Sequence, residues 1–342
     1  MKTVLVIRAS AMGDVAMTAP VLKEVQRRYG NEVRVVMLTP KFMQPFFFDS
    51  PEVEFFELDL KGKHKGFSGI VRLFKELRAR YCFDAVLDLN TKLFSKLLTL
   101  FFRLRGVKTY SIDKGRTGKK ALCRTKNKKL TQQKSSVERY ADVFNRAGFE
   151  VTLSNNMLPR TQRTVPEFAG AKHQKWIGIA PFAKHRGKML PLRVVRELVE
   201  VIATNTPDTR VFIFGGGSQE RALAQTLVES FPNCTSAIGR VTLKEEMDLM
   251  ANLDVMVAMD SSAMHLCSLL GVRVVSIWGA THPLAGFLGY GQSTEDVVSL
   301  CMACRPCSVY GNKACRRGDY ACLEGITAEM IYNRLLKGTS KN

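Results

Sequence analysis

A carboxylate stands where the first apolar segment of the chain ends. Asp14 follows the apolar residues 3–9 and a turn of small residues, and it precedes a stretch with helical spacing. The common role of such a residue is to cap the helix, because its side chain accepts hydrogen bonds from free N–H groups. The alternative is a general base, which accepts a proton as a hydroxyl group attacks. The local pattern leaves both roles open.

Two cations follow an apolar segment in the second half of the chain. Lys184 and Lys188 come after residues 176–180, in a run that a solvated basic loop also explains. In open α/β sheets, however, ligands bind outside the carboxyl ends of the strands. The chain contains no Asp-x-Asp sequence to hold a metal–diphosphate complex. Lysines and helix N–H groups would therefore stabilise the charge of a bound diphosphate.

A glycine-rich turn follows the next apolar segment. Gly215-Gly216-Gly217 brings backbone amides close to any ligand at that edge, but it is not G-x-G-x-x-G and no P-loop lysine follows it. A nicotinamide or P-loop site is therefore not favoured. Glu220, just inside the following helix, either bonds a ribose hydroxyl or supports the first helical turn as an acid.

Residues 253–283 contain an apolar strand, a polar turn, a short helix and a second apolar strand. The turn is Asp260-Ser261-Ser262, and the helix after it is too apolar to face water. The free N–H groups of a buried helix start need partners, which the turn residues or a ligand phosphate would supply. His265 on this helix is either a satisfied core residue or a ligand contact.

Composition limits the partners of the chain. The 342 residues carry 51 Lys and Arg against 31 Asp and Glu, a net charge of +20 with a pI near 9.7. This excess favours polyanions such as nucleic acid, lipid headgroups or phosphorylated substrates. It is concentrated between Arg103 and Arg139, where the aperiodic residues 113–134 are expected to form an exposed loop. No targeting or membrane-spanning segment is visible, so we expect a cytoplasmic protein, soluble or peripheral.

Five of the nine cysteines lie close together near the C-terminus. Their spacing matches neither a standard zinc ribbon nor a ferredoxin sequence, and a cytoplasmic chain keeps its thiols reduced. A metal site and a tight loop of free thiols both remain open. The residues are Cys301, Cys304, Cys307, Cys315 and Cys322.

Strands alternate with helices twice along the chain, with a polar, proline-bearing stretch over residues 151–175 between the two series. Helices are expected over 15–29, 67–81 and 92–104 in the first half. This pattern predicts an α/β protein of two doubly wound domains facing one cleft. We place the first domain at residues 1–160 and the second at 161–325. The last segment, 326–342, is expected to form a helix.

Taken together, these residues resemble the ADP-heptose:lipopolysaccharide heptosyltransferases, glycosyltransferase family 9. The N-terminal IRASAMGDVAMTAPVLKEV is similar to the family motif of Ser-x-Met-Gly-Asp followed by a helix with an early proline. Residues 260–265 and 278–283 resemble its Asp-Ser-Gly-Pro-Met-His and Phe-Gly-x-Thr-x-Pro signature. The resemblance covers nearly the whole chain and implies the GT-B fold of two Rossmann-like domains. In GT-B proteins the C-terminal helix can cross back to the first domain.

The resemblance implies inverting transfer of heptose from ADP-heptose to a lipopolysaccharide inner-core or lipid A hydroxyl, without a cofactor or a catalytic metal. Asp14 then matches the position of the family's base. The residues expected to bind the donor are Lys184, Lys188, Gly216, Glu220, Asp260, Ser261, Ser262, Ala263 and His265. The residues expected to bind the acceptor are Ser10, Met12, Gly13, Arg116, Lys119 and Lys120.

The sequence departs from the family pattern at several positions. Ser262 and Ala263 replace Gly-Pro, so the glycine backbone of the family is missing there. Lys184 stands where some members have a hydroxyl residue and Met189-Leu190 replaces an aromatic-bearing pair, so we expect the sugar selectivity to differ accordingly. The expected partners are the nucleotide sugar, a phosphorylated acceptor and the anionic inner-membrane surface, which the basic residues 103–139 would meet; no nucleic acid is expected. The alternatives are a GT-B transferase that uses another nucleotide sugar and a non-catalytic polyanion or RNA binder.

Overall fold

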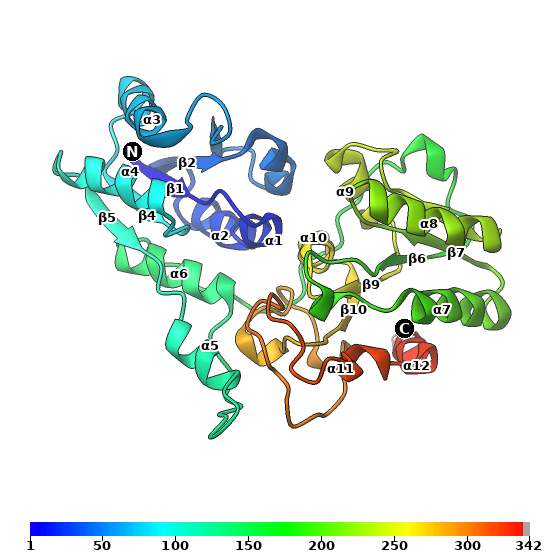
Figure 1. The fold of residues 1–342 in the computed structure, drawn as a ribbon. Helices are drawn as coiled ribbons and strands as arrows, with labels where there is room; N and C mark the ends of the chain where they lie inside the picture. Colours follow the sequence, from blue (N-terminus) through cyan, green and yellow to red (C-terminus); the bar gives the residue numbers. More distant parts are fainter. Residues whose placement is uncertain (338–342) are drawn as a thin grey trace. The chain divides into compact units, whose positions relative to one another are not determined.

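The computed structural model describes residues 1–337, which form two compact units (Figure 1). Unit 1 consists of Met1–Lys114 and Lys134–Ser154. Unit 2 consists of Gly115–Gln133 and the chain from Asn155 onward. The division differs from the single boundary expected at residue 160, because residues 115–133 belong to the second unit. The expected segment 326–342 lies partly outside the described residues.

Unit 1 contains a parallel sheet of five strands in the order β3-β2-β1-β4-β5. The central strand β1 is buried on both faces, because Val4, Leu5, Val6 and Ile7 have no exposed surface. Such continuous apolar runs are typical of parallel sheets covered by helices on both sides. The strands are β1 (Lys2–Ile7), β2 (Val33–Thr39), β3 (Glu54–Glu57), β4 (Ala85–Asp88) and β5 (Lys108–Ser111).

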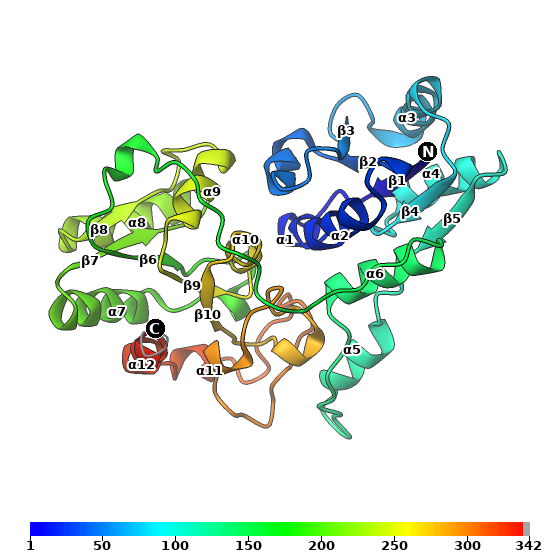
Figure 2. The ribbon, with the colours of Figure 1, turned by 180° about the vertical axis from the view of Figure 1, so that it is seen from behind.

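Helices cover both faces of this sheet: α3 packs against α4, and α2 packs against α6 (Figures 1 and 2). The helix expected over 15–29 is two helices, α1 and α2, because Pro20 lacks an N–H group and is accommodated in the first turn of α2. The helices of unit 1 are α1 (Met12–Ala16), α2 (Ala19–Tyr29), α3 (Gly66–Arg80), α4 (Leu93–Arg103) and α6 (Ser136–Arg146), with 3₁₀ turns η1 (Gly30–Glu32) and η2 (Lys41–Phe47).

Unit 2 contains a parallel sheet of six strands in the order β11-β10-β9-β6-β7-β8. Two parallel α/β sheets confirm the predicted fold class. The order reverses between β6 and β9, as in a doubly wound nucleotide-binding sheet. The strands are β6 (Lys175–Ala180), β7 (Thr209–Ile213), β8 (Cys234–Ser236), β9 (Val255–Met259), β10 (Arg273–Ile277) and β11 (Val297–Val298).

The helices of unit 2 pack on its sheet in two groups. Residues of α7, α8 and α12 share one apolar core, while α9 packs against α10. They are α5 (Arg116–Leu122), α7 (Leu192–Asn205), α8 (Ser218–Ser230), α9 (Leu243–Ala251), α10 (Ser262–Leu269), α11 (Ala321–Glu324) and α12 (Ala328–Lys337), with η3 (Glu167–Ala169), η4 (Arg186–Lys188), η5 (Pro283–Ala285) and η6 (Thr294–Asp296). None of the helices within residues 1–337 is long and apolar enough to cross a bilayer.

The described part of the C-terminal helix packs in unit 2, where Ile331 and Leu335 of α12 are buried with α7. One expectation about these elements is wrong. Residues 113–134 are not an aperiodic exposed loop, since they contain α5 and Leu122 is fully buried. We call residues 115–133 the excursion, because they leave and rejoin unit 1 in sequence while packing in unit 2.

Candidate functional site

The carboxyl ends of two neighbouring strands define a candidate position in each sheet. In unit 1 the strand order reverses between β1 and β4, and in unit 2 it reverses between β6 and β9. Ligands of doubly wound sheets bind at such switch points, because the connections on either side diverge and leave backbone groups accessible. Each unit therefore has a candidate position of its own.

The unit 1 part is built around an ion pair between Asp14 and Arg8. Arg8 directly follows β1, and its guanidinium lies 2.6 Å from Asp14 Oδ2. The same oxygen accepts a hydrogen bond from the backbone N–H of Ala11 at 3.0 Å. Asp14, at the third position of α1, thus bonds back to the N-cap residue Ala11 and is ion-paired at the same time. Within the described residues both contacts use Oδ2, so Oδ1 is the oxygen available to a substrate hydroxyl.

Arg8 is held in place by groups of β4 and α6. Its guanidinium donates to the carbonyl oxygen of Leu89 and lies 5.5 Å from the centre of the Tyr140 ring. The Tyr140 hydroxyl donates to the carbonyl oxygen of Asp14 at 3.2 Å, and burial raises the pKa of Tyr140, so it remains a donor. Sequence reasoning missed Arg8. The available signal was an arginine interrupting an apolar strand, which must find a buried partner.

The turn between β1 and α1 contains the three residues of this unit that were expected to bind the acceptor. Ser10 accepts a hydrogen bond from the ammonium of Lys92 at 2.8 Å, while Met12 is half-buried and Gly13 is buried. Next to this turn Asn90 follows β4, and its side-chain oxygen accepts from the N–H of Ala9 at 3.2 Å. Asn90, after β4, thus fixes the turn, in which Ser10 is bonded to Lys92 close in sequence to Asp14.

The unit 2 part is also built around an ion pair. Lys188 follows β6 and Asp260 follows β9, and their side chains are 3.0 Å apart. The two strands are neighbours in the sheet, so the pair lies at the switch point. Asp260 is 5% exposed, and its burial is compensated by the lysine.

Close backbone contacts fix the position of Lys188. The carbonyl oxygen of Gly187 accepts from the N–H of Ala280 at 2.8 Å. Gly311, with a φ of +75°, lies against the aliphatic part of Lys188, where a Cβ atom would come within 2.5 Å of the side chain. The loop after β10 is held in turn by buried Arg305, which donates to the carbonyl oxygens of Trp278 and Gly279. Sequence reasoning missed Arg305 as well, because no local pattern indicates these distant acceptors.

Helix α10 begins beside Asp260 without a side-chain cap. The N-cap residue Ser261 makes no capping hydrogen bond, and both Ser261 and Ser262 are half-buried. Ala263 and His265 are buried, as is the rest of the helix. The N–H groups of the first turn therefore have no side-chain cap, which suits an anion.

The glycine turn after β7 is bound by a side chain of the helix that follows it, α8. The Glu220 carboxylate accepts a hydrogen bond from the N–H of Gly216 at 2.6 Å. A Cβ atom on Gly215 would lie 2.7 Å from that carboxylate, so glycine is required for the contact. Glu220 stabilises the turn in this structure, and Gly216 itself faces open space.

The remaining candidate cations lie in different environments. Lys184 is exposed in the loop after β6. Arg116, Lys119 and Lys120 were expected in the first domain but belong to the excursion in unit 2. Lys119 is only 4% exposed, and its ammonium lies 4.1 Å from the centre of the Phe287 ring.

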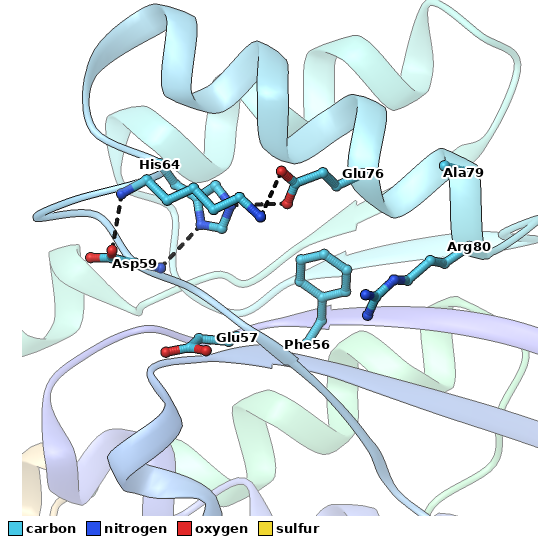
Figure 3. Close-up of a pocket in the computed structure, with 8 residues that line it drawn as sticks. Phe56, Glu57, Asp59, His64, Glu76, Ala79 and Arg80 are labelled. Atoms are coloured by element: carbon cyan, nitrogen blue, oxygen red, sulfur yellow. Dashed lines mark hydrogen bonds and ion pairs between the residues drawn. The ribbon is translucent and has the colours of Figure 1, made fainter.

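A pocket of about 460 Å³ lies beside β3 and α3 of unit 1 (Figure 3). His64 is buried at its wall, where Nδ1 accepts from the N–H of Asp59 at 3.1 Å and Nε2 donates to Glu76 at 3.2 Å. Hydrogen bonds from the backbone of Lys63 and Gly62 lower the pKa of Asp59. These contacts fix the loop between β3 and α3, and none of the expected site residues lines the pocket.

The cysteines near the C-terminus are free thiols. Burial raises the pKa of Cys307 and raises that of Cys322 to about 11. Within residues 1–337, no three His, Cys, Asp or Glu side chains are grouped so that they could hold a metal ion. The metal site and the loop of free thiols both stay predictions from the sequence.

Comparisons with known proteins agree with this architecture. Residues 70–316 match the model of glycosyltransferase family 9 (heptosyltransferase). Lipooligosaccharide heptosyltransferase 2 of Haemophilus influenzae is 22% identical, over 97% of this chain and 98% of that protein. A glycosyl transferase family 9 structure from Veillonella parvula has a TM-score of 0.75 at 18% identity, covering 98% of this chain and 96% of the other. The structure of E. coli ADP-heptose lps heptosyltransferase II has a TM-score of 0.66 at 19% identity, covering 99% and 100%.

Proposed function

Because the chain belongs to glycosyltransferase family 9 (heptosyltransferase), we propose that it transfers a heptose from ADP-heptose to a hydroxyl group of a lipopolysaccharide inner-core or lipid A acceptor. The E. coli relative is by name an ADP-heptose heptosyltransferase, and the Haemophilus influenzae relative acts on lipooligosaccharide by name. The acceptor is phosphorylated and lipid-linked, and the enzyme works as a peripheral protein on the cytoplasmic face of the inner membrane.

The observation that carries the proposal is the ion pair of Lys188 and Asp260 beside the uncapped start of α10. A departing ADP leaves with negative charge on its β-phosphate. Lys188 and the N–H groups of the first turn of α10 lie at the switch point where that charge is stabilised. Ser261, Ser262 and Ala263 contribute these N–H groups.

The proton of the acceptor hydroxyl is accepted by a residue of unit 1. The acceptor hydroxyl attacks the anomeric carbon while the bond from that carbon to the phosphate oxygen breaks, and its electrons leave with ADP. Asp14 accepts the hydroxyl proton through Oδ1, while Arg8 and the N–H of Ala11 hold Oδ2. Attack from the face opposite the leaving group inverts the configuration. General-base catalysis of this kind contributes about 10²–10⁴-fold in rate.

The donor is tested by thermal unfolding of the full chain with ADP, ADP-heptose, and UDP- and GDP-sugars. We expect ADP and ADP-heptose to raise the melting temperature, since a ligand at 100 times its Kd stabilises by about 2.7 kcal/mol. Stabilisation by a UDP- or GDP-sugar instead would identify a transferase with another donor. Indifference to all nucleotides, together with steeply salt-dependent RNA binding, would identify the polyanion binder.

A further inference from the structure

Helix α4 is apolar on the face that points away from the core. Its buried residues Ser95, Leu98 and Phe102 lie on one side. At 100° per residue, the opposite side contains four leucines spaced by four, three and four residues. Leu93 is 76% exposed and Leu104, at the C-terminal end, is 74% exposed. Leu97 and Leu100 between them are half-buried, and Leu97 packs against the core of unit 1.

The neighbouring helix α3 extends this apolar surface. Phe67, in the first turn of α3, is 65% exposed, and its ring centre lies 6.1 Å from that of Phe101 on α4. The two helices pack side by side on one face of the first sheet (Figures 1 and 2). A helix face with several exposed large apolar side chains normally marks an interaction site. We define the α3–α4 surface by Phe67, Leu93, Leu100 and Leu104.

Cations border this surface without acidic residues beside them. Lys96 and Arg103 flank the leucines on α4, and both are exposed. Helix α4 contains no Asp or Glu. The one acid of α3, Glu76, is paired with Lys63 at 2.8 Å and with His64 at 3.2 Å. The border of the α3–α4 surface therefore carries positive charge that the helices themselves do not neutralise.

We propose that the α3–α4 surface docks the enzyme on an anionic phospholipid bilayer. Helices with leucine and phenylalanine on one side and Lys or Arg at the border bind in the headgroup region, where the cations reach the phosphates while the apolar side chains enter the acyl boundary. A second copy of the chain does not fit this surface, because pairing two α4 helices would bring Lys96 and Arg103 of both copies together without an acid.

This docking surface rests on the proposed function, because a lipid-linked acceptor is reached at a membrane. The surface differs from the basic residues 103–139, which the sequence alone assigned to the membrane. Of the basic residues 103–139, Arg103 borders the α3–α4 surface, whereas residues 115–133 belong to unit 2. The segment that meets the bilayer is thus α4 with the start of α3.

The test is sedimentation of the full chain with vesicles of phosphatidylethanolamine and phosphatidylglycerol, and with phosphatidylcholine vesicles. We expect binding to the anionic vesicles only. Lys96→Gln with Arg103→Gln should weaken it by about thirtyfold, since each basic residue near the surface contributes about fivefold. The matched control, Lys126→Gln with Lys129→Gln in the excursion, removes the same charge and should bind like the wild type.

Apolar contact is tested by Leu93→Ser with Leu104→Ser, which should reduce binding more than tenfold, as expected for about 0.8 kcal/mol per buried methylene group. Leu130→Ser with Leu223→Ser is the control, because these leucines are exposed elsewhere, at 58% and 38%. Both pairs should leave the unfolding transition unchanged. Equal binding of all variants, or a dimer that Leu93→Ser with Leu104→Ser dissociates, would overturn the proposal.

Transfer to a short water-soluble acceptor is measured on the same samples. Wild-type protein that transfers heptose but ignores anionic vesicles would overturn the docking surface and leave the proposed function intact. Protein that binds the vesicles but never transfers would contradict the proposed function, since the α3–α4 surface contains none of the reacting groups.

Discussion

Both units place an ion pair at the switch point of a parallel sheet, but the two pairs have opposite orientations. In unit 1 the cation is the buried partner: the side chain of Arg8 is 6% exposed, whereas that of Asp14 is 31% exposed. In unit 2 the carboxylate is the buried partner, since the side chain of Asp260 is 7% exposed and that of Lys188 is 16% exposed. The same contact therefore presents a carboxylate in one unit and an ammonium group in the other.

This difference matches the two charges that develop in the proposed transfer. The proton of the acceptor hydroxyl needs a carboxylate, and the departing diphosphate needs a cation. In each unit the buried partner orients the exposed one, which limits its rotation before substrate arrives. The comparison predicts that breaking the pair in unit 1 affects the chemical step, whereas breaking the pair in unit 2 affects ADP binding.

The largest effect is expected from Asp14→Asn. The amide keeps the shape of the carboxylate but cannot accept the proton, so kcat should fall on the order of 10³-fold. The affinity for ADP, measured by isothermal titration calorimetry, should stay unchanged. Asp49→Asn is the control, because Asp49 is also paired with a cation, Lys23, but on the surface of unit 1. Turnover close to that of the wild type in Asp14→Asn would remove Asp14 as the base.

A second prediction separates the stability of the unit 2 pair from its function. Lys188→Met leaves Asp260 buried without its cation, which should lower the free energy of unfolding by about 3 kcal/mol. It should also weaken ADP binding by about tenfold or more, since a charge-assisted contact is lost. Lys188→Met with Asp260→Asn should recover most of the stability but not the ADP affinity. Recovery of both, by denaturant titration and calorimetry, would show that Lys188 only compensates Asp260.

A third carboxylate, that of Glu246, differs from both pairs because within residues 1–337 it forms no salt bridge. Burial of Glu246 on α9 raises its pKa from 4.5 to about 7. Between these values the folded protein retains a proton that the unfolded chain has lost, so the free energy of unfolding falls as the pH rises and levels off above about pH 7. Glu246→Gln should remove this decrease in the free energy of unfolding with rising pH.

Glu246→Gln should increase the free energy of unfolding relative to the wild type, and this increase should be about 1–3 kcal/mol larger at pH 8 than at pH 4.5. Denaturant titrations at the two pH values measure it, with Glu229→Gln on the exposed side of α8 as the control. A gain of equal size at both pH values would contradict the assignment of the raised pKa to Glu246.

Local patterns were sufficient for the strands and for the family. Apolar runs such as residues 3–7 and 255–259 are strands in the structure, as is typical of strands buried on both faces of a parallel sheet. The motifs around Asp14 and Asp260 predicted a family that the family model confirms. The roles of individual site residues remain predictions, although the structure puts Lys188 and Asp260 together at 3.0 Å.

Contacts made at long range were not predicted from the sequence. The partners of Arg8 come from β4, α1 and α6, which are separated from it by up to 132 positions in the chain. The basic neighbours of Lys119 favour an acceptor contact, yet its side chain is buried against Phe287. The amphipathic pattern of helix α12 likewise shows that one face is buried but not which core buries it.

The excursion has a consequence for how the protein can be divided. Unit 2 is assembled from two separate pieces of sequence, and Lys128 of the excursion donates to the carbonyl oxygens of Ala303, Arg305 and Pro306. A fragment starting at Asn155 would lose these bonds and the cover over Phe287. In recombination between relatives, unit 2 is therefore inherited intact only when residues 115–133 are exchanged together with it.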